Sequence, residues 1–197
     1  MKTPLNLAIL TAAVSLVGCA THIQPSKFSN PPPAERFSSF DRFELKRVQL
    51  SPTYAGDGAN QRAAAKIQQY FDERLQPTVT GWNRDGKGGE RTLLIEPRIE
   101  QIKFIGVGAR IWAGPLAGSS AVVMKVKYTD KSTGKVIAEP EFFQRAAAMS
   151  GAFTVGGQDN AMLARIVTLA ANYNANNFSQ PVGGETGATP DTELEAN

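Results

Sequence analysis

Cysteine and histidine are almost absent from this chain of 197 residues, which has one of each. One cysteine cannot form a disulfide within the chain, and it cannot build a metal centre of several cysteines. The one histidine, His22, lies in a segment that we expect to be extended, where no rigid partner would orient its ring as a general base. We therefore expect no cofactor, no metal ion and no catalysis by a cysteine–histidine pair.

A strong excess of one charge is also missing. The chain has 21 lysine and arginine residues against 18 aspartate and glutamate residues. Lys2 belongs to a segment that we expect to be removed, which brings the balance closer to neutral. Nucleic-acid binding needs a basic surface, and a nearly neutral chain has little net positive charge to form one. We expect no nucleic acid among the partners.

Long hydrophobic runs are missing as well. The longest, residues 5–17, spans about 13 residues, whereas a helix needs about 20 apolar residues to cross the hydrocarbon core of a membrane. The basic residue Lys2 precedes this run and small residues follow it, which is the arrangement of an export signal. We expect residues 1–18 to be a signal peptide.

The apolar run ends in the four residues Leu16, Val17, Gly18 and Cys19. This pattern resembles the signal of bacterial lipoproteins. The resemblance implies that a signal peptidase recognises Leu16, Val17 and Gly18 and cuts before Cys19, which carries a diacylglycerol thioether and an N-acyl chain. Ala20 stands where lipoproteins of the inner membrane usually carry aspartate, so the resemblance implies the periplasmic face of the outer membrane. An ordinary secretory signal is the alternative.

Composition divides the rest of the chain into three parts. Residues 19–41 contain the triple proline Pro31-Pro32-Pro33, which favours an extended conformation and predicts a tether between the lipid anchor and the domain. A loop packed on the domain is the alternative for residues 37–40. Residues 42–178 form the predicted domain, and residues 179–197, acidic and rich in glycine, predict a disordered tail.

Hydrophobic periodicity predicts two helices and four strand regions in the domain. A repeat of three and four residues predicts helices over residues 61–75 and 160–178, with Asn60 and Asp159 as N-caps and Pro77 as the end of the first helix. Alternation predicts strands over residues 43–50, 91–105 and 121–128, with a hairpin partner running from residue 136 through residue 145. A parity switch near Glu100 and Gln101 predicts a bulge, and Pro97 predicts an edge position or an irregularity.

The element order β-α-β-β-β-α predicts a single α+β domain. A strand–helix–strand unit favours a parallel pair, whereas the later hairpin is antiparallel, so the predicted sheet is mixed. We expect four strands with both helices packed on one face.

Residues 106–120 are unusual because four glycines are interspersed with apolar side chains, among them Ile111, Trp112 and Leu116. The glycine spacing matches neither a dinucleotide-binding fingerprint nor a phosphate-binding loop. Two interpretations are left open. The segment folds over the domain with Trp112 in the core, or it is an apolar loop whose residues Ile111, Trp112 and Leu116 bind a partner or a bilayer.

The stretch from Leu116 to Phe178 carries a second resemblance. Ala117-Gly118-Ser119-Ser120 leads into a valine-rich strand, the turn Asp130-Lys131-Ser132-Thr133-Gly134-Lys135 follows, and Gly156-Gly157 precedes the last helix. This pattern resembles a family of bacterial lipoproteins with a domain of unknown function. It is similar, more loosely, to the α/β domain of envelope lipoproteins that activate cell-wall synthases or build secretion pores. The resemblance implies a fold over residues 43–178 and brings no catalytic residue.

These observations predict a non-enzymatic, lipid-anchored module that binds another envelope protein or a copy of itself. A carrier of a small apolar ligand, with a pocket between helices and sheet, is one alternative. An envelope hydrolase is a weaker one, because its candidates are limited to the carboxylates of Glu96 and Glu100 and the hydroxyls of Ser119 and Ser120.

Overall fold

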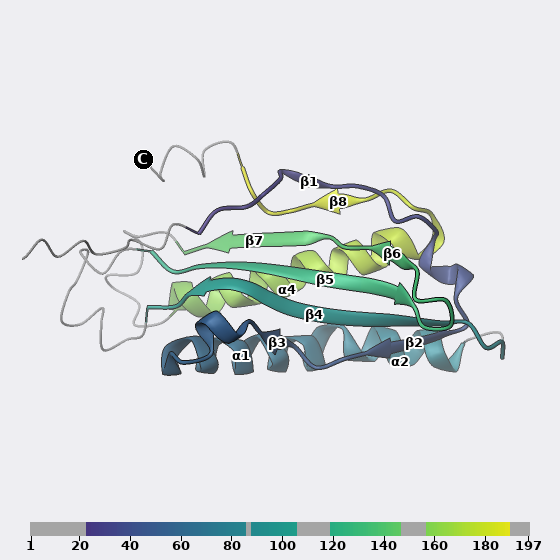
Figure 1. Ribbon diagram of the computed structural model, residues 1–197, viewed down its shortest axis with the longest axis horizontal. Helices are drawn as coiled ribbons and strands as arrows, with labels where there is room; N and C mark the ends of the chain where they lie inside the picture. The colour runs from purple at the N-terminus through teal and green to yellow at the C-terminus, as the bar shows by residue number, and fades with distance from the viewer. Residues whose placement is uncertain (1–22, 86–87, 106–118, 147–156, 190–197) are drawn as a thin grey trace, which may run out of the picture.

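Apolar and polar residues alternate along much of the strand β4 (Thr92–Lys103), and this alternation decides which face of the sheet is buried. A computed structural model describes residues 23–85, 88–105, 119–146 and 157–189 (Figure 1). β5 (Ala121–Asp130) is the most deeply buried strand and lies beside β4. The inward-facing side chains of both strands form one layer of the core: Leu93, Ile95, Ile99, Val122, Met124, Val126 and Tyr128.

The sheet is mixed and has six strands in the part of the chain that the structure describes. β2 (Arg42–Leu45) and β3 (Gln49–Leu50) both pair in parallel with β4, as the strand–helix–strand unit predicts. β4 pairs antiparallel with β5, as do β6 (Val136–Ala138) and β7 (Glu141–Arg145) on the other side of β5. The predicted bulge is confirmed by a register shift between Ile99 and Gln101. The sheet exceeds four strands because the first and last predicted strands are each interrupted.

Pro97 lies inside the sheet, at the gap between β2 and β3. β2 pairs with β4 as far as Ile95, and β3 resumes the pairing at Arg98. On the other side Pro97 faces Val126, whose N–H donates to the carbonyl of Pro140 at 3.1 Å. The position without an N–H therefore coincides with the break in the parallel pairing. The predicted irregularity is present, although β4 is not an edge strand.

Among the described residues, three helices pack on one face of the sheet: α1 (Gly58–Arg74), the shorter α2 (Gln76–Arg84) and α4 (Gly157–Ser179). Each contributes fully buried apolar side chains to the core cluster shared with the sheet, such as Ile67 and Phe71, Val79, and Ile166. α2 is a correction to the prediction. Pro77 lies in its first turn, where a backbone N–H has no partner within the helix, so the proline begins a new helix rather than ending the helical region.

The N-cap of α1 is also a correction. The side chain of Asp57, not that of Asn60, accepts hydrogen bonds from the N–H groups of Ala59 at 2.7 Å and Asn60 at 3.0 Å. Asn60 is buried, and its Oδ1 accepts from the N–H of Phe104 at 3.0 Å. The asparagine thus joins the start of α1 to the end of β4.

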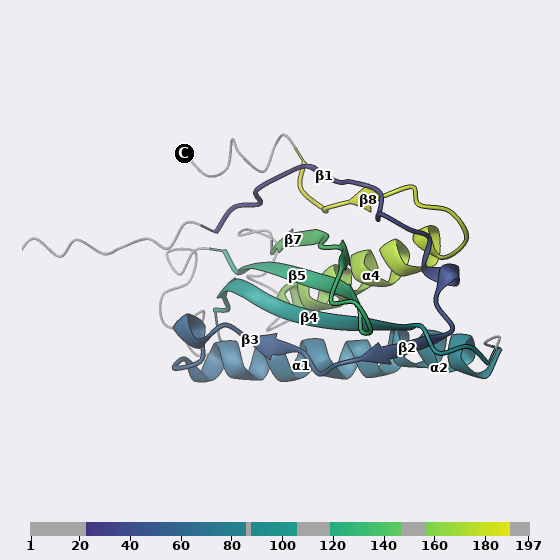
Figure 2. The same ribbon diagram turned by 45° about the vertical axis from the view of Figure 1, so that its right-hand side comes forward.

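Residues 23–41 of the predicted tether are packed along the outer edge of the sheet rather than extended away from it. β1 (Ser29–Asn30) lies outside β7 (Figures 1 and 2), and the N–H of Ala34 donates to the carbonyl of Ile137 in β6 at 2.8 Å. Phe37, in the 3₁₀ helix η1 (Phe37–Ser39), is fully buried, and Phe40 is nearly so. The physical reason is that β6 and β7 leave an open edge of backbone groups, and the aromatic rings gain from burial.

The start of the predicted disordered tail is packed as well. β8 (Gly184–Glu185) pairs antiparallel with β1, and the N–H of Phe143 in β7 donates to the carbonyl of Thr186 at 2.8 Å. Thr186 is fully buried. The predicted boundaries at residues 42 and 178 are therefore too narrow, and residues 190–197 of the predicted tail lie outside the described ranges.

The single α+β domain and its mixed sheet are confirmed. Another 3₁₀ helix, η2 (Pro52–Tyr54), leads into α1. In the part of the chain that the structure describes, the helices fall short of the length and apolarity needed to cross a membrane.

Candidate functional site

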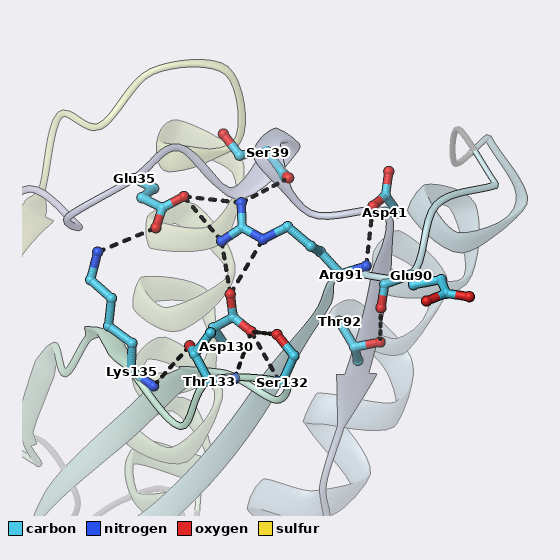
Figure 3. Close-up of polar contacts among 10 residues, drawn as sticks. All are labelled: Glu35, Ser39, Asp41, Glu90, Arg91, Thr92, Asp130, Ser132, Thr133 and Lys135. Atoms are coloured by element: carbon cyan, nitrogen blue, oxygen red, sulfur yellow. Dashed lines mark hydrogen bonds and ion pairs between the residues drawn. The ribbon is translucent and has the colours of Figure 1, made fainter.

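The densest group of charged contacts surrounds Arg91, just before the start of β4 (Figure 3). Its guanidinium donates to the carboxylate of Asp130, at the end of β5, at 2.8 Å, and to that of Glu35 at 3.2 Å. It also lies over the ring of Phe40, 4.3 Å from the centroid. Lys135 reaches Glu35 from the turn after β5 at 3.4 Å. We call Glu35, Arg91, Asp130 and Lys135 the Arg91 cluster.

Electrostatics in the Arg91 cluster favour the charged forms of Glu35, Arg91 and Asp130. The Ser132 hydroxyl and then the Arg91 guanidinium donate hydrogen bonds that hold the pKa of the Asp130 carboxyl well below its ordinary value. The Arg91 guanidinium likewise lowers the pKa of Glu35, and the carboxylates of Asp130 and Glu35 raise the pKa of Arg91. A general acid or base needs a pKa near the working pH, and these shifts move the carboxyl groups away from it.

A polar cleft of about 460 Å³ lies beside the Arg91 cluster, lined by residues of β2, α2 and the start of β4. Several of its polar side chains are already bonded within the protein. Asn83 of α2 accepts from the N–H of Phe43 at 2.7 Å and donates to its carbonyl at 2.9 Å, which binds α2 to the edge of β2. Glu44 pairs with Lys131 at 2.7 Å and also with Lys46.

The Arg91 cluster thus joins segments that are distant in the sequence. Glu35 belongs to the packed N-terminal segment, Arg91 to the start of β4, and Asp130 to the turn that ends β5. Within the described ranges, no three histidine, cysteine, aspartate or glutamate side chains are grouped so that they could hold a metal ion. The arrangement serves to hold the N-terminal segment against the sheet.

The face of the sheet away from the helices carries alternating charges. Glu96 lies opposite Lys127 in the register of β4 and β5, and Arg98 opposite Lys125. Arg98 forms an ion pair with Glu100 at 3.3 Å. Glu96 and Glu100, the carboxylates considered for a hydrolase, therefore lie among basic side chains on an open surface with a shallow cleft of about 270 Å³.

Two groups of residues singled out in the sequence lie outside the described ranges. They are the predicted lipoprotein signal with the predicted lipidation site (Leu16, Val17, Gly18, Cys19) and the apolar residues Ile111, Trp112 and Leu116. The residues that flank the second group are described. Ile105 donates its N–H to the hydroxyl of Ser120 at 3.0 Å, and both are buried, which joins the end of β4 to the chain just before β5. Ser120, considered as a nucleophile, is fully buried.

Sequence reasoning missed the Arg91 cluster, although one part of it has a local signal. Aspartate followed two residues later by serine is typical of a turn closed by the aspartate side chain. The Asp130 carboxylate accepts from the Ser132 N–H at 3.0 Å and from the Ser132 hydroxyl at 2.6 Å. The partners Arg91 and Glu35 lie 39 and 56 residues from their contacts in this cluster, so no local pattern could identify them.

No protein-family model matches this chain, and no curated protein matches it. Solved structures give similarities at low identity. The PelC dodecamer from Paraburkholderia phytofirmans is 12% identical with a TM-score of 0.33, and the alignment covers 72% of this chain and 94% of that chain.

Two further structures are similar at the same level. The hypothetical protein CT253 from Chlamydia trachomatis is 9% identical with a TM-score of 0.36, covering 69% of this chain and 99% of that chain. A protein from Caulobacter crescentus CB15 named a "putative lipoprotein" is 12% identical with a TM-score of 0.32, covering 68% of this chain and 88% of that chain. At these values the similarities define neither a family nor a function for this chain.

Proposed function

We propose that this protein is a lipoprotein of the outer membrane whose periplasmic domain is a non-enzymatic module that binds another envelope protein or a second copy of itself. The observation that carries the proposal is the sequence Leu16-Val17-Gly18-Cys19 at the end of a short apolar run. Acyl chains on Cys19 attach the chain to the membrane. Ala20, rather than aspartate, directs it to the outer membrane.

The chemistry of the described side chains supports a binding module. The carboxyl groups of the Arg91 cluster have lowered pKa values, Ser120 is buried, and Glu100 is paired with Arg98. None of these arrangements, within the described ranges, brings a nucleophile together with a base. The alternating charges on the open face of the sheet and the apolar residues Ile111, Trp112 and Leu116 are the surfaces we assign to partner binding.

The carrier alternative has less support. The layer between helices and sheet, where a ligand would lie, is filled by side chains that are fully buried, among them Ile67, Phe71, Met124, Phe142 and Ile166. Packing of this kind leaves no room for a ligand among these side chains.

Fractionation of cells tests the anchor and its location together. We expect the protein in the outer-membrane fraction. Cys19→Ala should leave it out of the membrane fractions, because the acyl chains have no attachment site. Ala20→Asp, which keeps Cys19, should move it to the inner membrane. Membrane association that survives Cys19→Ala would contradict the lipid anchor, and an unchanged location of Ala20→Asp would contradict the sorting.

Crosslinking in cells tests the binding function. A photoreactive residue at Trp112 should give one dominant adduct, either with an envelope protein or with a second copy of the chain. Val136, 45% exposed at the start of β6, is the control position. Equal patterns from the two positions, or none from Trp112, would remove Ile111, Trp112 and Leu116 from the binding surface.

A further inference from the structure

The packed N-terminal segment brings the domain close to Cys19. Ile23 is 2% exposed and packs against Ala121, Val123 and Phe143 on the sheet. Its carbonyl accepts a hydrogen bond from the Arg145 guanidinium at 3.1 Å. Three residues lie between Cys19 and Ile23. The four residue steps from one to the other span at most about 14 Å when fully extended. If Cys19 is in a membrane, this end of the domain lies next to the headgroups.

One end of the domain is defined by these contacts. Lys103, Ala121 and Arg145 lie in one row across β4, β5 and β7. α1 and α4 begin at the same end, as Figure 1 shows, and a groove of about 370 Å³ between them is lined by Phe104 and by side chains of both helices. We call this the anchor end. The Arg91 cluster lies at the opposite end of β4 and β5.

Basic side chains gather at the anchor end. Arg62 and Lys66 of α1 line the groove with Phe104, Lys103 ends β4, and Arg165 of α4 donates to the side chain of Gln144 beside Arg145 at 2.9 Å. We call these five side chains the basic set: Arg62, Lys66, Lys103, Arg145 and Arg165. Among the described residues, none of the five forms an ion pair, whereas Lys46, Arg91, Lys131 and Lys135 pair with carboxylates elsewhere.

The basic set has five members, and two carboxylates lie beside it at the N-terminal ends of α1 and α4. Asp57 caps the first turn of α1, and Asp159 is 3% exposed in the first turn of α4. The anchor end therefore presents an excess of positive charge. Phosphate groups of anionic lipids attract such side chains within about one Debye length, roughly 10 Å at moderate ionic strength.

We propose that the anchor end is a docking surface for anionic phospholipid headgroups, and that the domain stands on the membrane with its long axis directed outward. The proposal rests on the lipid anchor of the proposed function. The short connection to Cys19 fixes which end faces the bilayer, and the basic set supplies the attraction. The Arg91 cluster and the C-terminal end of α2 then face the periplasm.

Spin labels on the full-length, acylated protein test this orientation. Cys19 is the only cysteine and is acylated, so a newly introduced cysteine is the one free thiol. Gly56→Cys, before α1, and Gly81→Cys, in α2, are a matched pair, because a Cβ at either position meets nothing within 4 Å. α1, with 17 residues and a length of about 25 Å, separates them.

The protein is reconstituted in phosphatidylglycerol vesicles that contain a nickel-chelating lipid, whose Ni²⁺ relaxes nearby spin labels. We expect strong relaxation of the label at position 56 and little at position 81. Equal relaxation at both positions, or stronger relaxation at position 81, would overturn the orientation. Mass spectrometry of the same preparation verifies acylation, so a missing acyl chain would count against the proposed function and not be mistaken for a wrong orientation.

Charge reversal tests the headgroup contact. Arg62→Glu with Lys103→Glu should reduce the relaxation at position 56 in phosphatidylglycerol vesicles, as should high salt with the unchanged protein. Arg36→Glu with Arg42→Glu, which changes the net charge equally at the far end, should leave it as it was. Relaxation that is unaffected by the first pair and by salt would overturn the role of anionic lipid. Should the first pair fail to fold, the salt dependence decides alone.

Discussion

The side chain of Asn30 and the backbone of Glu141 form a reciprocal pair of hydrogen bonds. The Asn30 Nδ2 donates to the Glu141 carbonyl at 2.8 Å, and the Glu141 N–H donates to the Asn30 Oδ1 at 2.8 Å. An asparagine side chain thereby takes the place of a neighbouring strand at the edge of β7. The contact joins residues 111 positions apart and fixes the N-terminal segment to the sheet.

Asn30→Ala should therefore destabilise the protein. Two backbone groups of Glu141, in a residue that is 3% exposed, lose their partners. Leaving a buried donor or acceptor unpaired costs about 1–3 kcal/mol for each group, so we expect a loss of about 2–6 kcal/mol in the free energy of unfolding. Urea denaturation followed by tryptophan fluorescence measures it. Ser29→Ala, the adjacent residue in β1, is the control. Equal stability of the two variants would contradict a structural role for the N-terminal segment.

Gly187→Ala should detach the C-terminal segment from β7. Gly187 has a φ of 83°, and an added Cβ would meet the side chain of Leu169 and lie 2.6 Å from the carbonyl oxygen of Phe143. Gly134→Ala is a matched control, because Gly134 has a φ of 71° but nothing within 4 Å of an added Cβ. Both variants bear the conformational cost of about 1–2 kcal/mol, and Gly187→Ala alone adds a steric clash.

The hydrogen-exchange rate of a single amide measures the difference between the two variants. The Phe143 N–H, which donates to Thr186, should exchange faster in Gly187→Ala and remain protected in Gly134→Ala. Unchanged protection in Gly187→Ala would mean that the C-terminal segment does not cover β7.

Loss of Arg91 should change how stability depends on acid. The pKa values of Asp130 and Glu35 are lower in the folded protein than in the unfolded chain, so their contribution is complete above the unfolded pKa values, near 4. It is lost as the pH falls through the folded values. Arg91→Met raises these folded pKa values, which flattens the acidic part of the stability curve.

Urea denaturation of both proteins at pH 7 and at pH 2.5 measures the effect. The stability difference between the original protein and Arg91→Met should be larger at pH 7 than at pH 2.5. Arg98→Met, which removes the exposed pair with Glu100, is the control and should have a small effect at both pH values. A difference for Arg91→Met that is equal at both pH values would contradict the assigned ion pairs.

Much of the domain could be predicted from local patterns. Alternation identified β4 and β5, the three- and four-residue repeat identified α1 and α4, and a parity switch at Glu100 identified the bulge. Each signal lies within a short window, where the side chains of one element face a common core. The parallel pairing followed from the connection rule for strand–helix–strand units.

The packing of the terminal segments could not be predicted in this way. The triple proline is compatible with a free tether and with an extended segment that lies on the protein. The second arrangement depends on distant partners. The carbonyl of Pro31, for example, accepts a hydrogen bond from the hydroxyl of Tyr173 at 3.1 Å, 142 residues away. Similarly, Asp57 and Asn60 are both good capping residues, and the contact of Asn60 with Phe104 decides between them.

The candidate sites show the same difference between local and long-range signals. The proposed lipoprotein signal is a local pattern of four residues, so the sequence alone is enough to suggest it. The Arg91 cluster and the basic set at the anchor end form only when distant elements meet, since Arg62, Lys103 and Arg145 come from three separate elements.

The central claim is that Cys19 is the acylated first residue of the mature protein. Mass spectrometry of the N-terminal peptide, prepared from the membrane fraction of cells that produce the full-length chain, tests it most directly. We expect a chain that begins at Cys19 and carries a diacylglyceryl group and an N-acyl chain. A mature chain that begins at any other residue, or a Cys19 with a free thiol, would contradict the account.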